Sequence, residues 1–308
     1  MLPAPATSNP SILIAGCGYT GLRAAQLWQS RGLSVTAISR SQDRAALFRH
    51  LGLQPLVLNL AEPAAWPEFP AADVVVWCVG YDRSSGTSRR AVWIDGLSRF
   101  LQALPPATTS RRLILTSSTS VYGDSSGLEV NETTPPQPSQ EGGQACLEAE
   151  QMLTSFAQQS GDVSVILRLA GIYGPDRLLR RLEDLHKGIP IAAHPDEWLN
   201  LVHVDDIVKA LDHVAFCNSP PALMNVVSAP GQTREQYYQA LATLANAPAP
   251  VFNPAAERPD TGRGRSGNRR VTSVVRSGCG LTFQYDDCHL GLQHALGLRP
   301  PTQEGPQR

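Results

Sequence analysis

The sequence lacks the cysteine patterns of a metal site or of a disulfide-rich secreted domain. Its six cysteines form no C-x-x-C pair, and no histidine lies at zinc-ligand spacing from them. A chain of 308 residues can also bury a sizeable core without disulfides. We therefore expect no metal, and reduced, mostly buried thiols in a cytoplasmic protein.

Excess charge and long apolar runs are missing as well. The formal net charge is −1, so no overall field attracts nucleic acid or an anionic membrane. The stretch GRGRSGNRR at 262–270 could grip a phosphate, although a solvated loop is the ordinary alternative. The N-terminal MLPAPATSNP has no signal-peptide pattern, and no apolar run reaches membrane-spanning length. These absences predict a cytoplasmic protein without a nucleic-acid or membrane partner.

What the chain does contain is an alternation of apolar runs of strand length with longer helical patterns. The runs are continuous, as in strands of a parallel sheet that is covered by helices on both faces. A helix is expected at 20–32, with Gly32 as its stop signal. The repeat of strand, helix and strand predicts a doubly wound α/β domain. The expected strands are 11–16, 33–40, 55–60, 73–80, 111–118 and 163–171.

Beyond residue 171 the pattern loosens, and proline and glycine become frequent. We expect a helix at 205–217, with Asp205 or Asp206 capping its start. Another is expected at 233–247, capped by Thr233, and a last one at 286–296.

The turn after the first expected strand carries three glycines in the pattern G-x-G-x-x-G. Gly16, Gly18 and Gly21 follow an apolar strand and open an amphipathic helix. Gly16 would allow the tight turn, Gly18 the approach of a pyrophosphate, and Gly21 the close packing of helix on strand. Because the phosphates would lie at the positive end of the helix, this context predicts a dinucleotide site.

The end of the second expected strand indicates which dinucleotide binds. An NAD site usually has Asp or Glu there, whereas this chain has Ser39 and Arg40, with Arg44 one helical turn later. An arginine suits the 2′-phosphate of NADP. Since arginine also stacks on an adenine ring, NAD remains the alternative.

Five stretches together resemble the extended short-chain dehydrogenase/reductase superfamily, in its NAD-dependent epimerase/dehydratase branch. The resemblance covers roughly residues 11–295. It is carried by GCGYTGLRAAQLWQSRG, LILTSSTSVYGD, the helix ending in CLEAE, LRLAGIYGPDR and NLVHVDDIVKAL.

This resemblance implies a Rossmann domain, a smaller C-terminal substrate cap, and a small-molecule substrate in the cleft between them. Nucleotide sugars are the commonest substrates of the branch, and homodimers that pair through two long helices, here 88–104 and 141–160, are frequent. The implied boundaries are 1–175 with 199–228 for the Rossmann domain, 176–198 and 229–298 for the cap, and 299–308 for a disordered tail.

The resemblance also assigns site residues. Ser118 would be the substrate-facing hydroxyl, and Tyr122 belongs to the same turn. Asn59 stands where an Asp often contacts adenine. The full set expected around the cofactor is Gly16, Gly18, Tyr19, Thr20, Gly21, Ser39, Arg40, Arg44, Asn59, Cys78, Val79 and Gly80.

The catalytic Tyr-x-x-x-Lys pair of the superfamily is absent. Counting back from Glu150 places Gly142 and Cys146 at its positions. The missing tyrosine would transfer the proton, and the missing lysine would hold the ribose and lower the tyrosine pKa. A chain without the pair resembles the atypical members of the superfamily.

Substitute groups stand nearby in the sequence. Tyr122 or Glu141 could donate a proton, but Tyr122 could simply pack in its turn and Glu141 could simply favour the helix start. Ser118 alone, without a base, is not a catalyst. His203, followed by Asp205 and Asp206, suggests a metal site, but a structural histidine is favoured because neighbouring side chains at a helix start diverge.

Two functions of different classes therefore stay open. One is an atypical NADP-binding oxidoreductase or epimerase-like enzyme that acts on a small metabolite. The other is a dinucleotide-binding sensor or regulator without turnover, which the lost Tyr and Lys favour. A pure scaffold fits poorly with an intact glycine turn.

Overall fold

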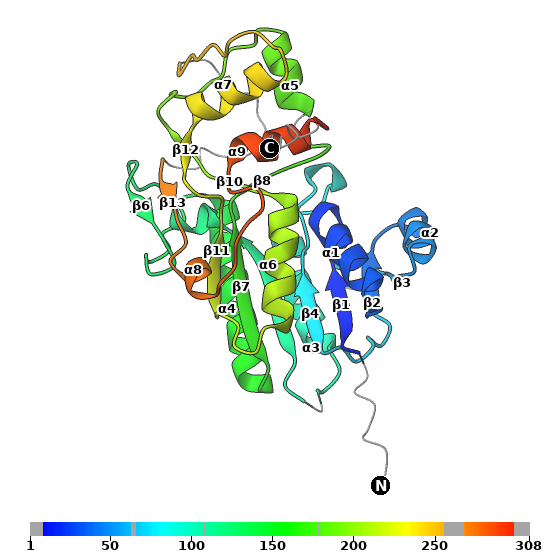
Figure 1. Cartoon of the computed structure of the whole chain (residues 1–308). Coiled ribbons are helices and arrows are strands. Elements are labelled where there is room, and N and C mark those ends of the chain that lie inside the picture. Colours follow the sequence, from blue (N-terminus) through cyan, green and yellow to red (C-terminus); the bar gives the residue numbers. More distant parts are fainter. Residues whose placement is uncertain (1–8, 63–65, 108, 178, 256–267, 299–308) are drawn as a thin grey trace, which may run out of the picture. The chain divides into compact units, whose positions relative to one another are not determined.

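The computed structural model describes residues 9–62, 66–107, 109–177, 179–255 and 268–298 (Figure 1). The expected tail at 299–308 and most of the 262–270 stretch lie outside these residues. The chain forms two compact units. The first unit is Met1–Val121, Glu141–Arg168 and Val208–Met224, and the second is Tyr122–Gln140, Leu169–Ile207 and Asn225–Arg308.

A seven-stranded parallel sheet is the centre of the first unit, in the order β11-β7-β5-β4-β1-β2-β3. This confirms the predicted doubly wound α/β fold. The strands are β1 (Ser11–Ala15), β2 (Ser34–Ser39), β3 (Gln54–Val57), β4 (Val74–Trp77), β5 (Arg112–Ser118), β7 (Val163–Leu169) and β11 (Leu223–Val226).

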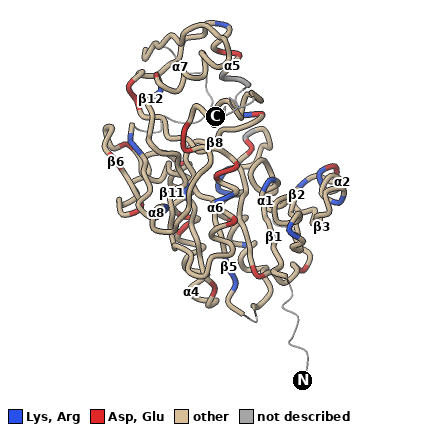
Figure 2. Tube along the Cα trace, in the orientation of Figure 1, with Lys and Arg blue, Asp and Glu red and all other residues tan. Residues whose placement is uncertain are grey.

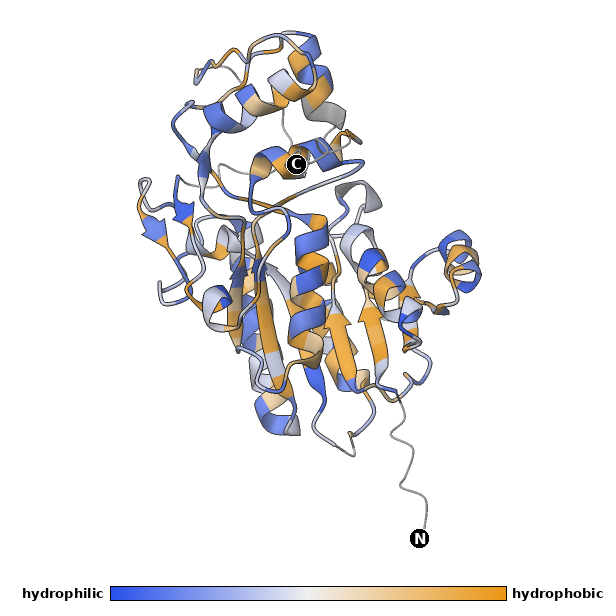
Figure 3. Ribbon diagram, viewed as in Figure 1, coloured by the Kyte–Doolittle hydropathy of each residue, from blue (hydrophilic) through white to orange (hydrophobic). Residues whose placement is uncertain are grey.

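Burial explains why the strands read as continuous apolar runs. Every residue of β4, VVVW, is buried, and so are the last four residues of β1. In Figure 3 the central strands are accordingly coloured as hydrophobic along their length. Strands buried on both faces need apolar side chains at every position, which removes the alternation seen in half-exposed strands.

Helices cover both faces of the sheet (Figure 1). One face carries α1 (Tyr19–Ser30) and α6 (Val204–Phe216), and the other carries α3 (Gly96–Ala103) and α4 (Glu141–Ser160). Trp28 of α1 is fully buried, contacts Phe216 edge-on, and donates its indole N–H to Asp212 at 3.0 Å. This bond satisfies the polar atom of the buried ring and fixes α1 against α6.

The second unit combines short strands with helices. Thr233 caps α7 as predicted, within a capping box completed by Gln236. The hydrophobic core of the second unit includes Tyr173, Tyr238 and Leu292. The elements are β6 (Glu129–Val130), β8 (Gly171–Tyr173), α5 (Leu179–His186), β9 (Trp198–Leu199), β10 (Leu201–His203), β12 (Gln232–Thr233), α7 (Arg234–Leu244), β13 (Arg270–Val271), α8 (Val275–Gly278) and α9 (Cys288–Ala295).

Some elements differ from the sequence-based expectation. Helix α2 (Gln42–His50) was not predicted, although Ser41 caps it by accepting the amide of Arg44. The expected helix at 88–104 is divided into a π-helical turn, Ala91–Asp95, and α3. Helix α6 begins at Val204, one residue before the expected start, so Asp205 and Asp206 lie in its first turn. The Asp206 carboxylate accepts the amides of Gln284 and Tyr285.

Charge is spread rather than gathered. Basic and acidic positions are interspersed along the trace in Figure 2, in keeping with the net charge of −1. Among the residues described, no helix has the length and apolar character needed to span a bilayer. All six cysteines are free.

Candidate functional site

The strand order changes direction between β1 and β4. From β1 the chain proceeds outward to β2 and β3, whereas β4 leads to β5, β7 and β11 on the other side. Ligands of open parallel sheets bind outside the carboxyl ends of the strands at such a point. The glycine turn follows β1 there, and Cys78, Val79 and Gly80 follow β4.

The three glycines of the turn meet different surroundings. Gly16 has φ +85°, and a Cβ on it would lie 2.6 Å from the backbone of Cys78. A Cβ on Gly21 would lie 2.7 Å from the carbonyl oxygen of Gly16. A Cβ on Gly18 would meet no atom within 4 Å. Packing therefore explains Gly16 and Gly21, while the open space at Gly18 fits a group that approaches from outside the chain.

The amino end of α1 also suits an anionic ligand. Gly18 is its N-cap, without a side-chain hydrogen bond to the first turn, and that turn holds no acidic residue. Tyr19 and Thr20 begin the helix. The backbone amides at the start of a helix, together with the helix dipole, attract a phosphate group. The turn is thus suited to the diphosphate of a dinucleotide.

The residues expected at the adenosine end lie around the same turn. Arg44 Nη2 donates to the Cys17 carbonyl at 2.6 Å, and Ser39 Oγ accepts the Ser41 amide at 3.3 Å. Arg40 forms an exposed ion pair with Asp82 at 3.3 Å. The structure thus brings Arg44 directly onto the glycine turn.

Asn59 and the segment after β4 complete the predicted set. The Asn59 amide donates to Glu62 at 2.6 Å. Val79 accepts the indole N–H of Trp93 at 2.9 Å. A Cβ on Gly80, as on Gly18, would meet no atom within 4 Å. Burial raises the pKa of the Cys78 thiol to about 12, so this thiol is neutral at physiological pH.

Helix α4 carries the two positions at which the superfamily has Tyr and Lys. At the first of them, a Cβ on Gly142 would overlap with Nη1 of Arg89, so the guanidinium lies where a side chain would project. At the second, Cys146 is buried. Lysine occurs in this chain only at positions 187 and 209, both exposed and outside α4.

Cys146 cannot replace the missing lysine or act as a base. Burial, and then the charge of Glu150, raise the pKa of its thiol to about 11. The Ser117 hydroxyl and the charge of Arg89 lower this pKa to a smaller extent. The thiol is therefore protonated at neutral pH, which favours an inert, buried role.

A buried ion pair supports this part of α4. Arg168 of β7 binds Glu150 at 2.7 Å with both side chains almost fully buried, and Ser117 Oγ donates to Glu150 at 2.5 Å. The sequence analysis did not assign these residues. An arginine inside the apolar run VILRLAG was the available signal, because a charge in a buried strand requires a partner.

The three candidate catalytic residues lie in different surroundings. Ser118 ends β5, and its Oγ accepts the Ser120 amide at 3.1 Å. Glu141 is exposed at the start of α4. Tyr122 is 2% exposed, and its hydroxyl donates to Asn225 at 2.9 Å. This bond favours packing as the role of Tyr122.

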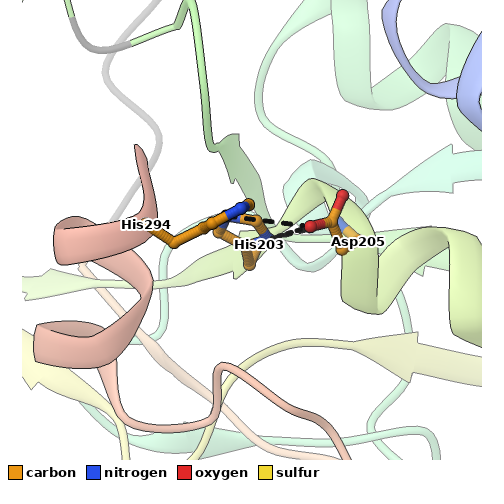
Figure 4. A group of neighbouring side chains, drawn as sticks. All are labelled: His203, Asp205 and His294. Carbon is orange, nitrogen blue, oxygen red and sulfur yellow. Dashed lines mark hydrogen bonds and ion pairs between the residues drawn. The ribbon is translucent and has the colours of Figure 1, made fainter. Parts of the chain in front are cut away.

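A group of possible metal ligands lies in the second unit (Figure 4). His203, Asp205 and His294 offer ligand atoms that all lie within 4.8 Å of one another. The Asp205 carboxylate is 3.7 Å from Nδ1 of each histidine. His294 comes from α9, far along the chain, so the sequence analysis did not join it to His203.

The hydrogen bonds of His203 explain this group without a metal. The Asp205 amide donates to His203 Nδ1 at 3.2 Å, so the neutral ring carries its proton on Nε2. That nitrogen is 3.2 Å from Nδ1 of His294, to which it can donate a hydrogen bond. A metal on Nε2 would need the proton on Nδ1, against the Asp205 amide. The geometry favours the structural histidine expected from the sequence.

Comparison with known proteins adds to this picture. The chain is 29% identical to the protein YeeZ of Escherichia coli K12 over 284 residues, which is 90% of this chain and 96% of YeeZ. A solved structure of a functionally unknown conserved protein from Silicibacter pomeroyi is 25% identical, with a TM-score of 0.76 and coverage of 94% and 99%.

A second solved structure shares the fold at lower identity. The UDP-glucuronic acid 4-epimerase of Bacillus cereus, in complex with UDP-glucuronic acid and NAD, is 16% identical, with a TM-score of 0.73 and coverage of 93% and 98%. A model of the NAD dependent epimerase/dehydratase family matches residues 12–226. The chain belongs to the NAD dependent epimerase/dehydratase family.

Proposed function

We propose that the protein binds a nicotinamide dinucleotide at the glycine turn and acts on a small metabolite, with a nucleotide sugar as the favoured class. The observation that carries the proposal is the contrast among the glycines. Gly16 and Gly21 are crowded by the chain itself, whereas Gly18 faces open space beside helix amides that have no side-chain cap.

The residues around this space would hold the cofactor as follows. Gly18, Tyr19 and Thr20 would present backbone amides to the diphosphate. Cys78, Val79 and Gly80 would line the ribose, and Asn59 would face the adenine. A bound nicotinamide would supply a hydride acceptor or donor. The Oγ of Ser118 accepts the Ser120 amide, and a hydroxyl that accepts one hydrogen bond can still donate another. Ser118 would therefore orient a substrate oxygen.

NADP is the form that the charges favour. Arg40 is exposed directly after β2 and forms an exposed ion pair with Asp82, a kind of pair that contributes little to stability. An Arg40→Ala variant should fold normally and should lose about tenfold or more in affinity for NADP but little for NAD. Equal weakening of both dinucleotides in calorimetric titrations would contradict the preference.

A sensor or regulator without turnover is the second candidate, and specific observations favour it. No Tyr or Lys stands at the two positions on α4, the Cys146 thiol is protonated at neutral pH, and the Tyr122 hydroxyl is engaged by Asn225. Incubation of the NADP-loaded protein with a panel of nucleotide sugars separates the two functions. A change in nicotinamide absorbance with any nucleotide sugar supports the enzyme. An unchanged absorbance with every member of the panel supports the sensor.

Thermal unfolding with NADP tests dinucleotide binding, which both candidate functions require. At a hundredfold excess over Kd, a ligand held only by the folded state should raise the Tm by about 5 °C or more. Gly18→Val should remove this shift, because the valine side chain would fill the space of the diphosphate. Gly278→Val is the matched control, since it also faces open space without a positive φ. An equal shift in both variants would contradict the site.

Location and assembly complete the proposal. The free cysteines fit the cytoplasm, where thiols stay reduced. Pairing of two copies through α4 and the 88–104 segment is the proposed dimer, and a monomer in sedimentation experiments would contradict it.

A further inference from the structure

Two aromatic rings hold the side chain of Arg89, and no carboxylate among the described residues binds it. Its guanidinium lies 4.7 Å from the ring centre of Tyr81 and 5.2 Å from that of Trp93. Both rings are anchored to backbone carbonyls, Trp93 at Val79 and Tyr81 at Thr87. The side chain is therefore positioned by a clamp that needs no ion pair.

The charge of Arg89 has no acidic partner among the described residues. Its Nε is buried without a hydrogen-bond partner there, and the residue as a whole is half-buried. Arg90, its neighbour, binds Glu148 with two hydrogen bonds of 3.0 Å on the surface. A buried polar atom without a hydrogen-bond partner is costly, so the arrangement favours an acceptor supplied by a ligand.

Beyond the two aromatic rings, Arg89 lies near polar residues of the candidate site. Its charge acts on the thiol of Cys146, around which Ser117 and Ser120 place their hydroxyls. The indole ring of Trp93, which lies against the Arg89 guanidinium, donates its N–H to the carbonyl of Val79, directly after β4. Gly142 leaves the room that the guanidinium occupies, because any Cβ there would overlap with it.

The chemistry of guanidinium limits what Arg89 can do. A guanidinium stays charged in proteins, so Arg89 cannot serve as a proton donor in the way a tyrosine does. It can bind acceptors, and its planar fork matches a carboxylate or a phosphate. With glycine at position 142 in place of the tyrosine of the superfamily, the site lacks that proton donor. The guanidinium of Arg89, which can bind an anion, occupies its space.

We propose that Arg89 binds a carboxylate or phosphate group of the ligand at the first turn of α4, in the site whose function is proposed above. This inference rests on that function for the presence of a ligand. The group could belong to the substrate or to the cofactor, and the two sources are distinguishable by experiment.

Calorimetric titration of NADP, UDP-glucose and UDP-glucuronate into the full chain tests the inference. Arg89→Met keeps an apolar side chain against Tyr81 and Trp93 but removes the charge. It should weaken at least one probe about tenfold or more, while Arg90→Met, the matched control, should change each affinity less than twofold. Arg89→Lys should restore only part of the loss, because lysine lacks the fork.

The pattern of losses identifies the anion. A loss for UDP-glucuronate alone indicates the sugar carboxylate, a loss for both UDP-sugars indicates the substrate diphosphate, and a loss for NADP alone indicates a cofactor phosphate. Wild-type affinity of Arg89→Met for all three probes overturns the inference, even when NADP binding itself supports the proposed function. Failure of the wild-type protein to bind any probe overturns both.

Discussion

At the scale of single residues, Gly16 and Gly18 differ in what the fold requires of them. Gly16 combines φ +85° with a Cβ position 2.6 Å from the backbone of Cys78, and Gly18 has neither constraint. The spacing of the glycines predicted different roles for these two positions. Sequence analysis could not foresee that Gly142 makes room for Arg89, because the two residues are distant in the chain and no local pattern links them.

Gly16→Ala should therefore destabilise the protein, while Gly18→Ala should not. A left-handed backbone and an overlap with backbone atoms together should lower the free energy of unfolding by about 2 kcal/mol or more at Gly16. Urea denaturation of both variants measures the difference. Equal stability of the two variants would contradict the account of the turn.

Buried thiols give the protein a dependence on alkaline pH. Burial raises the pKa of Cys17 and Cys78 to about 12 and that of Cys146 to about 11, from an ordinary value of 9.0. The unfolded chain releases these protons first, so the stabilisation present below pH 9 should decline between pH 9 and about 11 to 12. Denaturant titrations at pH 7.5, 9 and 10.5 measure this, and Cys146→Ala should show a shallower decline. A stability that does not change over this range would contradict the assignment.

At the scale of elements, α4 shows which parts of a helix the sequence reveals. Its extent at 141–160 was expected from the family resemblance, and the capped start of α7 was expected from Thr233. The division of the expected helix at 88–104 does not follow, since it depends on tertiary contact. A Cβ on Gly96 would lie 2.7 Å from the carbonyl of Leu60, so α3 approaches a distant loop at the point where the π-helical turn ends.

The buried pair of Glu150 and Arg168 ties α4 to β7. Glu150→Ala would leave the Arg168 charge buried without its partner and should lower the free energy of unfolding by roughly 3–5 kcal/mol. Glu148→Ala, in the same helix, removes an exposed pair and should cost less than about 1 kcal/mol. Chemical denaturation compares them, and similar losses would mean that the buried pair does not hold the helix.

At the scale of the whole molecule, the fold was predictable because the strands of a covered parallel sheet are continuous apolar runs. Amphipathic helices, with their own periodicity, separate these runs in the sequence. The place of the glycine turn was predictable too, since it follows the first strand and lies at the switch point of the sheet. The polar group around Arg89, Ser117 and Cys146 was not, because it joins residues from separate segments whose neighbourhood only the folded chain defines.

A crystal structure of the protein grown with NADP tests the central claim most directly. The account predicts diphosphate density against Gly18 and the first amides of α1, with the 2′-phosphate near Arg40. A folded protein saturated with NADP that holds the dinucleotide elsewhere, or with its diphosphate away from Gly18, would contradict it.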